Sequence, residues 1–207
     1  MSFTDTVCHD LYRYYGKLGL PIFLRAYLRI RAFRYTFWLR AAAHFRSRPG
    51  VPARIAHLVC RIFLEHYSLI FGYQIPAEAQ IGPGLYLGHV GTIVVHPAAT
   101  IGRNVNIAIG VTIGQTNRGR RQGVPTVGDR VWIGTNAVLV GRITIGEGAL
   151  IGPGAFVNFD VPMNGVVIGN PGRIVSEEGT AGYIGEHAGY KYNEPCILRD
   201  AGFVGPN

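Results

Sequence analysis

The stretch PTVGDRVWIGTNAVLVGRITIGEGALIGPGAFV, residues 125–157, places an aliphatic residue at every sixth position. The same spacing starts at residue 75, and its positions are Ile75, Ile81, Leu87, Ile93, Ile101, Ile107, Ile113, Val127, Ile133, Leu139, Ile145, Ile151 and Val157. A period of six fits neither an α-helix nor an alternating strand. A glycine follows eight of these thirteen residues. The pattern predicts a parallel β-helix of hexapeptides, with three hexads a coil and about four coils.

The repeat is irregular at two places. Ile93 and Ile101 lie eight residues apart, and Ile113 and Val127 lie fourteen apart. The first irregularity predicts an enlarged turn that contains His96. The second predicts an extended loop that carries three arginines, Arg118, Arg120 and Arg121.

Residues 1–72 lack the six-residue period and predict helices, with glycine and proline between them. In the last of these, residues 53–70, a set with helical spacing predicts the face that packs: Ile55, Leu58, Val59, Ile62, Phe63, His66 and Ile70. We therefore divide the chain into a helical segment (1–72), a β-helix (73–175) and an extended or partly disordered tail (176–207). Within 166–175, two strands joined by a turn are expected to close the β-helix. The fold class is mainly β.

The charge distribution limits the choice of partners. Twenty Lys and Arg against twelve Asp and Glu give a net charge of +8, and eleven of the twenty occur at or before Arg61. Basic helices of this kind suit either an oligomer or cap interface or the surface of a membrane or polyanion. No nucleic-acid-binding motif is present. Four arginines between Leu18 and Leu39 argue against a membrane-spanning helix.

The cysteines and the N-terminus indicate a compartment. Cys8, Cys60 and Cys196 are too widely spaced to suggest a disulfide framework, which favours a reducing cytoplasm. The polar start of the chain does not read as a signal peptide. We expect a cytoplasmic protein, at the inner face of the membrane if the basic helices dock there.

The hexads and the closing run Gly169-Asn170-Pro171-Gly172-Arg173 resemble the left-handed β-helix acyltransferases. Within that group, residues 73–175 are similar in register to serine acetyltransferase, because both irregularities of the repeat coincide. The resemblance implies a trimer that uses acetyl-CoA and binds it between subunits. It places a catalytic histidine at His89, with Gly88 and His96 beside the acceptor.

Three positions depart from that family. Its second active-site histidine corresponds to Val124, the acid before the first histidine to Gly88, and the acid that orients this histidine to Gln74. The loop around Arg118 is similar instead to acetyltransferases of bacterial polysaccharide clusters. The resemblance therefore favours a sugar hydroxyl of a surface polysaccharide as the acceptor. L-serine is the alternative acceptor, and a non-catalytic trimeric scaffold is the alternative from another class.

The residues fit this chemistry. A histidine titrates near neutrality and suits the removal of a proton from a hydroxyl, although a surface turn is the plainer interpretation of His89. Gln74 offers an amide oxygen to the imidazole N–H, as a backbone carbonyl would, and His96 suits a turn cap as well as a substrate contact. His89 and His96 are the only histidines in the coils, so no metal is expected.

The resemblance also assigns the cofactor site. Gly114, Thr135 and Pro153 would line the groove for the pantetheine arm, and Arg173 would lie near the adenosine phosphate. Arg118, Arg120 and Arg121 suit a pyrophosphate or a 3′-phosphate, with a solvated loop tip as the alternative.

Overall fold

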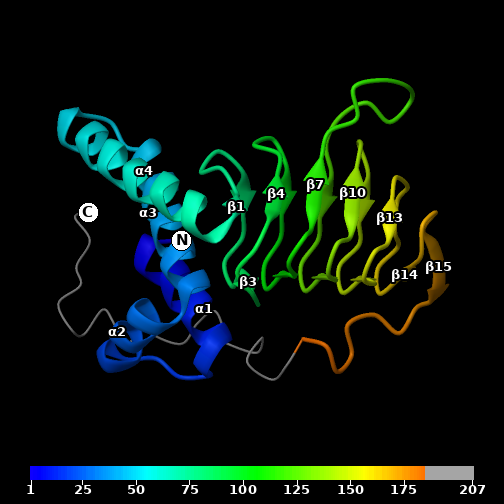
Figure 1. Cartoon of the computed structure of the whole chain (residues 1–207), viewed down its shortest axis with the longest axis horizontal. Helices are drawn as coiled ribbons and strands as arrows, with labels where there is room; N and C mark the ends of the chain where they lie inside the picture. Colours follow the sequence, from blue (N-terminus) through cyan, green and yellow to red (C-terminus); the bar gives the residue numbers. More distant parts are fainter. Residues whose placement is uncertain (185–207) are drawn as a thin grey trace.

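The computed structural model describes residues 1–184, in which a bundle of four helices precedes a solenoid of short strands (Figure 1). The helices are α1 (Phe3–Tyr15), α2 (Leu20–Arg29), α3 (Arg31–Arg46) and α4 (Val51–Phe71). No helix in this part of the chain is long and apolar enough to cross a membrane. The expectation of a disordered tail concerns mainly residues 185–207, which lie outside the described residues.

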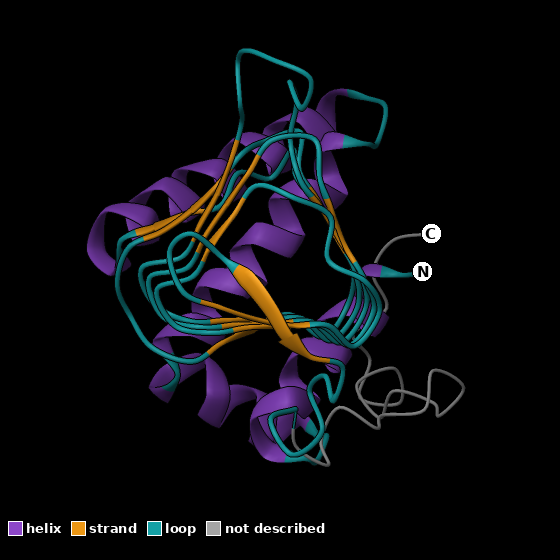
Figure 2. Cartoon of the chain, turned by 90° about the vertical axis from the view of Figure 1, so that its right-hand side faces the viewer, coloured by secondary structure: helices purple, strands orange, loops and turns teal. Residues whose placement is uncertain are grey.

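The solenoid strands form three sheets, which we call A, B and C, and Figure 2 shows them along the solenoid as the sides of a triangle. Sheet A holds β1 (Tyr73–Gln74), β4 (Ile93–Val95), β7 (Thr112–Gly114), β10 (Val138–Val140) and β13 (Phe156–Val157). Sheet B holds β2 (Gln80–Ile81), β5 (Thr100–Ile101), β8 (Thr126–Val127) and β11 (Thr144–Ile145). Sheet C holds β3 (Tyr86–Leu87), β6 (Asn106–Ile107), β9 (Trp132–Ile133), β12 (Leu150–Ile151), β14 (Val166–Ile168) and β15 (Arg173–Ser176).

Each coil gives one strand to each sheet. Four coils are complete, and a fifth has only the bridge Ile145↔Val161 in place of a sheet B strand. All pairings are parallel except β14 with β15, which returns antiparallel along the last coil. The predicted fold class, a left-handed parallel β-helix behind a helical segment, is confirmed, and so is the closing strand pair.

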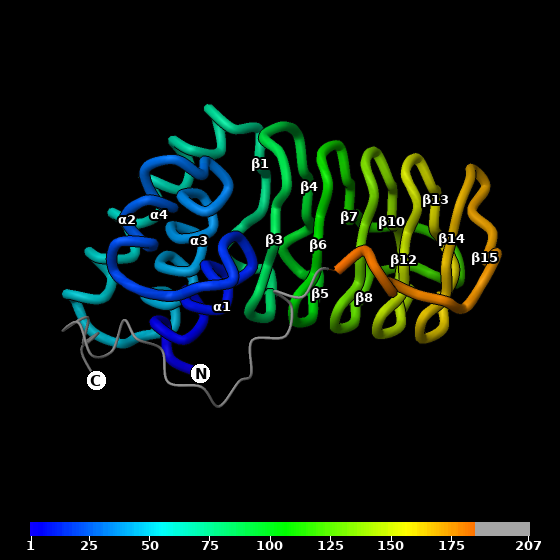
Figure 3. The backbone as a smooth tube through the Cα atoms, turned by 90° about the horizontal axis from the view of Figure 1, so that it is seen from below, coloured from blue at the N-terminus to red at the C-terminus, as the bar shows by residue number. Residues whose placement is uncertain are grey.

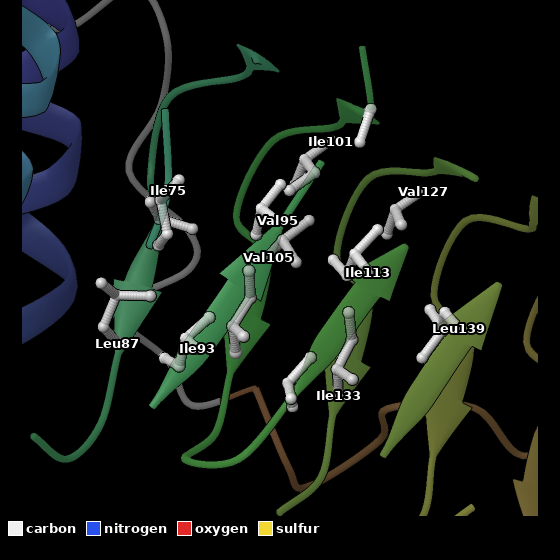
Figure 4. Packing of buried hydrophobic residues seen from close by; sticks show 14 of the residues in the cluster. Ile75, Leu87, Ile93, Val95, Ile101, Val105, Ile113, Val127, Ile133 and Leu139 are labelled. Carbon is white, nitrogen blue, oxygen red and sulfur yellow. The ribbon is translucent and has the colours of Figure 1, made fainter. Parts of the chain in front are cut away.

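The hexad residues form the core. Twelve of the thirteen aliphatic positions are buried, and only Ile81 is half-buried. They stack in register from coil to coil, as Ile101 does on Val127, and fill the solenoid (Figure 4). Glycine is required beside some of them because coils approach closely: a Cβ on Gly146 would lie 2.4 Å from the backbone N of Met163.

The helical bundle is joined to the first coil by a buried ion pair. Asp10 of α1 accepts from Nε of Arg40 in α3 at 2.8 Å and from the backbone N–H groups of Gly84 and Leu85. Arg40 also donates to the carbonyl oxygens of Ile81 and Gly82. The bundle thereby caps the open end of the solenoid and covers strand edges that would otherwise be exposed there.

Helix α1 begins at Phe3, because Ser2 and Asp5 form a capping box. One detail of the helices differs from the sequence prediction. Helix α4 packs on α3 through Cys60, Leu64 and Phe71. The face that the sequence predicted to pack is exposed instead, with Leu58 at 61% and Ile62 at 60%.

Cys196 lies outside the described residues, so the expectation that the three cysteines form no disulfide framework stays a prediction. Cys60 is a buried free thiol, and its burial raises the pKa of the thiol. The cytoplasmic location that we inferred from the cysteines stays a prediction.

The outer faces of sheets C and A differ in how far other residues cover them. On sheet C, Tyr86 packs against Tyr14 of α1, and Trp132 packs against Tyr183. The segment that contains Tyr183 follows β15 and runs back across the solenoid (Figure 3). The outer face of sheet A keeps partly exposed apolar residues, namely Val94, Val138, Val140 and Phe156.

Candidate active site

His89 lies in the turn that joins β3 of sheet C to β4 of sheet A. Its side chain is exposed. Gly91 makes this turn with a φ of +148°, a conformation that residues with a Cβ rarely adopt. The hexad thus places an imidazole on an edge of the solenoid, in reach of a ligand.

Two tyrosines, the buried Tyr73 and the half-buried Tyr14, hold this turn from inside. The hydroxyl of Tyr73 donates to the carbonyl oxygen of His89 at 2.9 Å. The hydroxyl of Tyr14 donates to the carbonyl oxygen of Leu87 and accepts from its N–H, both at 3.3 Å. Burial raises the pKa of both phenols, so both hydroxyls stay protonated donors. The sequence predictions missed these residues, because their aromatic rings look like ordinary core.

His96 follows β4 at the corner between sheets A and B. Its Nδ1 accepts from the backbone N–H of Ala98 at 3.1 Å, so a neutral ring carries its proton on Nε2. This is the turn-capping contact that we considered for His96. The same side chain lines a pocket of about 580 Å³ together with residues of the extended loop, including Val124.

Gln74 lies on the outer face of sheet A, in β1. Its side chain is exposed and lines a pocket of about 600 Å³ between α4 and the first two strands of this sheet. Within residues 1–184, no hydrogen bond joins Gln74 to the imidazole of His89. The structure therefore does not bring the two side chains together in a single chain, and the orienting role of Gln74 stays a prediction.

The edge that carries His89 continues along the whole solenoid. Thr135 and Pro153 occupy the same C-to-A corner two and three coils further on, where the N–H of Gly154 donates to the carbonyl oxygen of Thr135. Neighbouring strands lie about 4.8 Å apart, so the distance along this edge from His89 to Pro153 is about 14 Å. Arg173 follows the last such corner and is exposed. The edge thus aligns the predicted base with three of the predicted cofactor residues.

Two predicted site positions are glycines that the packing of this chain does not require. A Cβ on Gly114 would meet Val140 at 3.5 Å, and a Cβ on Gly88 would meet Tyr86 at 3.6 Å, both ordinary contacts. Neither glycine has a positive φ. Space is therefore open over both residues, on the outer face of sheet A and beside His89, and it suits a thin extended arm.

The extended loop leaves the solenoid after β7 and closes on itself through a bridge between Thr116 and Gly123. Arg118, Arg120 and Arg121 line a pocket of about 430 Å³ with Val140 and Phe156 of sheet A.

The charges of this loop are only partly neutralised. Arg121 donates to Asp160 at 2.9 Å, and the pKa of Asp160 is lowered first by the N–H of Thr144 and then by this arginine. Within the described residues, Arg118, Arg120 and Arg173 form no ion pair. Their charges are available to an anionic ligand such as a phosphate.

The loop and His89 lie at opposite ends of the strands of sheet A. His89 precedes β4 at the C-to-A corner, whereas the loop follows β7 at the A-to-B corner. A ligand that contacts both must either cross the outer face of sheet A or lie between two chains. Among residues 1–184, no group of three or more His, Cys, Asp or Glu side chains is placed to hold a metal ion.

Known proteins are similar to this chain in sequence and in structure. The model of the family "Bacterial transferase hexapeptide (six repeats)" matches residues 125–158. A serine acetyltransferase of Bacillus pumilus is 35% identical over 147 residues, which are 70% of this chain and 64% of that protein. The structure of soybean serine acetyltransferase complexed with serine is 30% identical, covers 81% of this chain and 67% of the soybean chain, and has a TM-score of 0.67. A serine acetyltransferase in complex with CoA is 25% identical, covers 83% of this chain and 68% of that chain, and has a TM-score of 0.64.

These comparisons correct the expected acceptor. The relatives are named serine acetyltransferase and not polysaccharide-cluster acetyltransferase, so the expectation of a sugar acceptor is wrong. The departures at Gln74, Gly88 and Val124 had favoured a sugar, whereas the repeat as a whole is similar to serine acetyltransferases. The chain spans 64% of the length of the Bacillus pumilus and Bacillus subtilis relatives, which is less than two thirds.

Proposed function

Since this chain belongs to the hexapeptide-repeat serine acetyltransferase family, we propose that it transfers the acetyl group of acetyl-CoA to the hydroxyl of L-serine. The observation that carries the proposal is the solenoid edge on which His89 is aligned with Thr135 and Pro153. This edge places a base at one end of a surface along which the pantetheine arm of acetyl-CoA can lie.

In this mechanism, His89 removes the proton of the acceptor hydroxyl as that oxygen forms a bond to the thioester carbonyl carbon. The C–S bond then breaks, and the imidazolium returns the proton to the leaving sulfur. A general base of this kind contributes roughly 10²–10⁴-fold to the rate. Backbone N–H groups of the coils stabilise the charge that develops on the carbonyl oxygen. Tyr73 and Tyr14 position the base by fixing its turn.

The bound acetyl-CoA supplies an activated acyl group, and the chain supplies the residues that hold the cofactor. In our proposal, the pantetheine arm lies over Gly114 and along the edge formed by Thr135 and Pro153. The arginines without ion pairs, Arg118, Arg120 and Arg173, contact the phosphates. Arg121 is held by Asp160 and fixes the loop.

We propose that the working form is a homotrimer, with each site between two chains. His89 and the loop lie at opposite ends of the strands of sheet A. This supports the arrangement, because a neighbouring chain can bring its own loop to His89. The partly exposed apolar residues on the outer face of sheet A offer a surface for the contact.

The departures from the family pattern affect serine binding. Gln74, Gly88 and Val124 replace two acids and a histidine that would help hold a zwitterionic amino acid. We therefore expect a higher KM for L-serine than in relatives that carry these groups.

The test is thiol release from acetyl-CoA, measured with a thiol reagent. L-serine should support release, and L-alanine, which lacks the hydroxyl, should leave the rate at the level without acceptor. Release that does not depend on L-serine would contradict the assignment of the acceptor. A chain that neither binds CoA nor releases thiol would be a scaffold.

A further inference from the structure

Helix α4 exposes a broad apolar face. Eight apolar side chains on it are exposed by between 39% and 87%, namely Val51, Ile55, Leu58, Val59, Ile62, Phe63, Leu69 and Ile70. We call these eight residues the α4 face. Leu58 and Phe63 mark its two borders, which lie about 140° apart around the helix at 3.6 residues a turn. Within this arc the only polar residue is His66. An exposed apolar surface of this width marks a site of contact with another surface.

The rest of α4 is either buried or charged. Cys60, Leu64 and Phe71 pack inside the chain, and Arg54, Arg61 and Glu65 form the strip next to Leu58. Glu65 is paired with Arg61 at 3.7 Å, whereas Arg54 forms no ion pair within residues 1–184. An apolar face with a net basic strip beside it is typical of helices that lie in the plane of a membrane surface.

The border of the α4 face next to α3 is aromatic. The Phe63 ring stacks on Trp38 with 4.3 Å between the ring centroids, and the indole N–H of Trp38 donates to the hydroxyl of Tyr27 in α2. The guanidinium of Arg34 lies over the rings of Tyr27 and Tyr67. Trp, Tyr and Arg each combine an apolar body with a polar tip, and they favour the boundary between lipid and water.

The distribution of charge indicates the sign of the surface that α4 meets. Residues 1–72 contain eleven Lys and Arg and three Asp and Glu, a net charge of +8. The nine basic and nine acidic residues of 73–207 cancel, so the helical segment carries the net charge of the whole chain. This segment forms one end of the described part of the chain (Figure 1). A membrane with anionic lipids attracts such an end.

We propose that the α4 face docks on the surface of a membrane that contains anionic lipids. The helix lies parallel to the membrane, with its apolar side chains among the upper parts of the acyl chains. Arg54 and the other exposed arginines of the helical segment contact the lipid phosphates. The contact is peripheral, because no helix within residues 1–184 is long and apolar enough to cross a membrane.

The first test is co-sedimentation of the full chain with vesicles of phosphatidylcholine, either alone or mixed with phosphatidylserine. The wild type should bind only the mixed vesicles, and salt should weaken the binding by screening the charges. Leu58→Asp/Ile62→Asp should lose the binding. The matched control is Met163→Asp/Val175→Asp, which adds the same charge at two exposed apolar residues of the solenoid and should bind as the wild type does.

The second test removes one cation. Arg54→Ala should lower the partition coefficient for the mixed vesicles about fivefold, the effect of a single cation near an anionic surface. Arg142→Ala, which removes an exposed arginine of the solenoid, should leave the coefficient unchanged. Circular dichroism checks that all variants keep their helices.

Equal binding of the wild type to both kinds of vesicle would overturn the proposal, and so would wild-type binding by Leu58→Asp/Ile62→Asp. A wild type that binds neither vesicle would overturn it too. A changed particle mass of Leu58→Asp/Ile62→Asp would then assign the α4 face to a protein contact. Vesicle binding is measured without acetyl-CoA or L-serine, so this proposal and the proposed reaction fail separately.

Discussion

At the scale of single residues, His89 owes its place to groups that lie far from it in sequence. The Tyr73 hydroxyl bonds to His89, 16 residues further along the chain. The Tyr14 hydroxyl bonds to Leu87, 73 residues further along. The register of the hexads was enough to predict the position of His89. It could not predict the tyrosines, because a hydroxyl that bonds to a backbone carbonyl leaves no periodic signal.

Gly114 gives a prediction at the same scale. An alanine there fits the fold, since a Cβ would make only ordinary contacts, but its methyl group would occupy the space proposed for the pantetheine arm. A steric clash of this kind costs about 1–3 kcal/mol, so Gly114→Ala should raise the KM for acetyl-CoA about tenfold. Thermal unfolding should show an unchanged Tm. An unchanged KM would remove Gly114 from the cofactor groove.

At the scale of elements, the solenoid strands could be predicted from the sequence and the packing of the helices could not. A hexad has one inward position, so its aliphatic residue indicates both the strand and the side that is buried. Helix α4 has apolar residues on two sides, with Cys60 and Leu64 on one and Leu58 and Ile62 on the other. Its sequence shows that the helix packs, but not which side faces its own chain.

The extended loop gives a prediction for an element. Arg118→Ala/Arg120→Ala removes two cations that form no ion pair within residues 1–184. Because a hydrogen bond to a charged group contributes about 1.5–3 kcal/mol, the KM for acetyl-CoA should rise about tenfold or more.

The matched substrate for this variant is S-acetylpantetheine, which lacks the phosphates. Wild type and variant should use it equally well. An equal loss with both substrates would instead mean that the arginines act through the shape of the loop.

At the scale of the whole molecule, the buried pair of Asp10 and Arg40 joins the helical bundle to the solenoid. Loss of one partner of a buried ion pair costs about 3–5 kcal/mol, so Asp10→Ala should lower the free energy of unfolding by that amount in urea titrations. Asp160→Ala breaks the exposed pair with Arg121 and should cost about 1 kcal/mol or less. Equal effects of the two variants would show that the buried pair does not join the two parts.

The role of His89 as general base is tested by the turnover number of His89→Ala with acetyl-CoA and L-serine, compared with wild type and with His66→Ala. His66 is an exposed histidine of α4, away from the proposed site. His89→Ala should lose roughly 10²–10⁴-fold in kcat, with the particle mass unchanged and His66→Ala at the wild-type rate. A His89→Ala variant that retains the wild-type kcat would show that His89 is not the base.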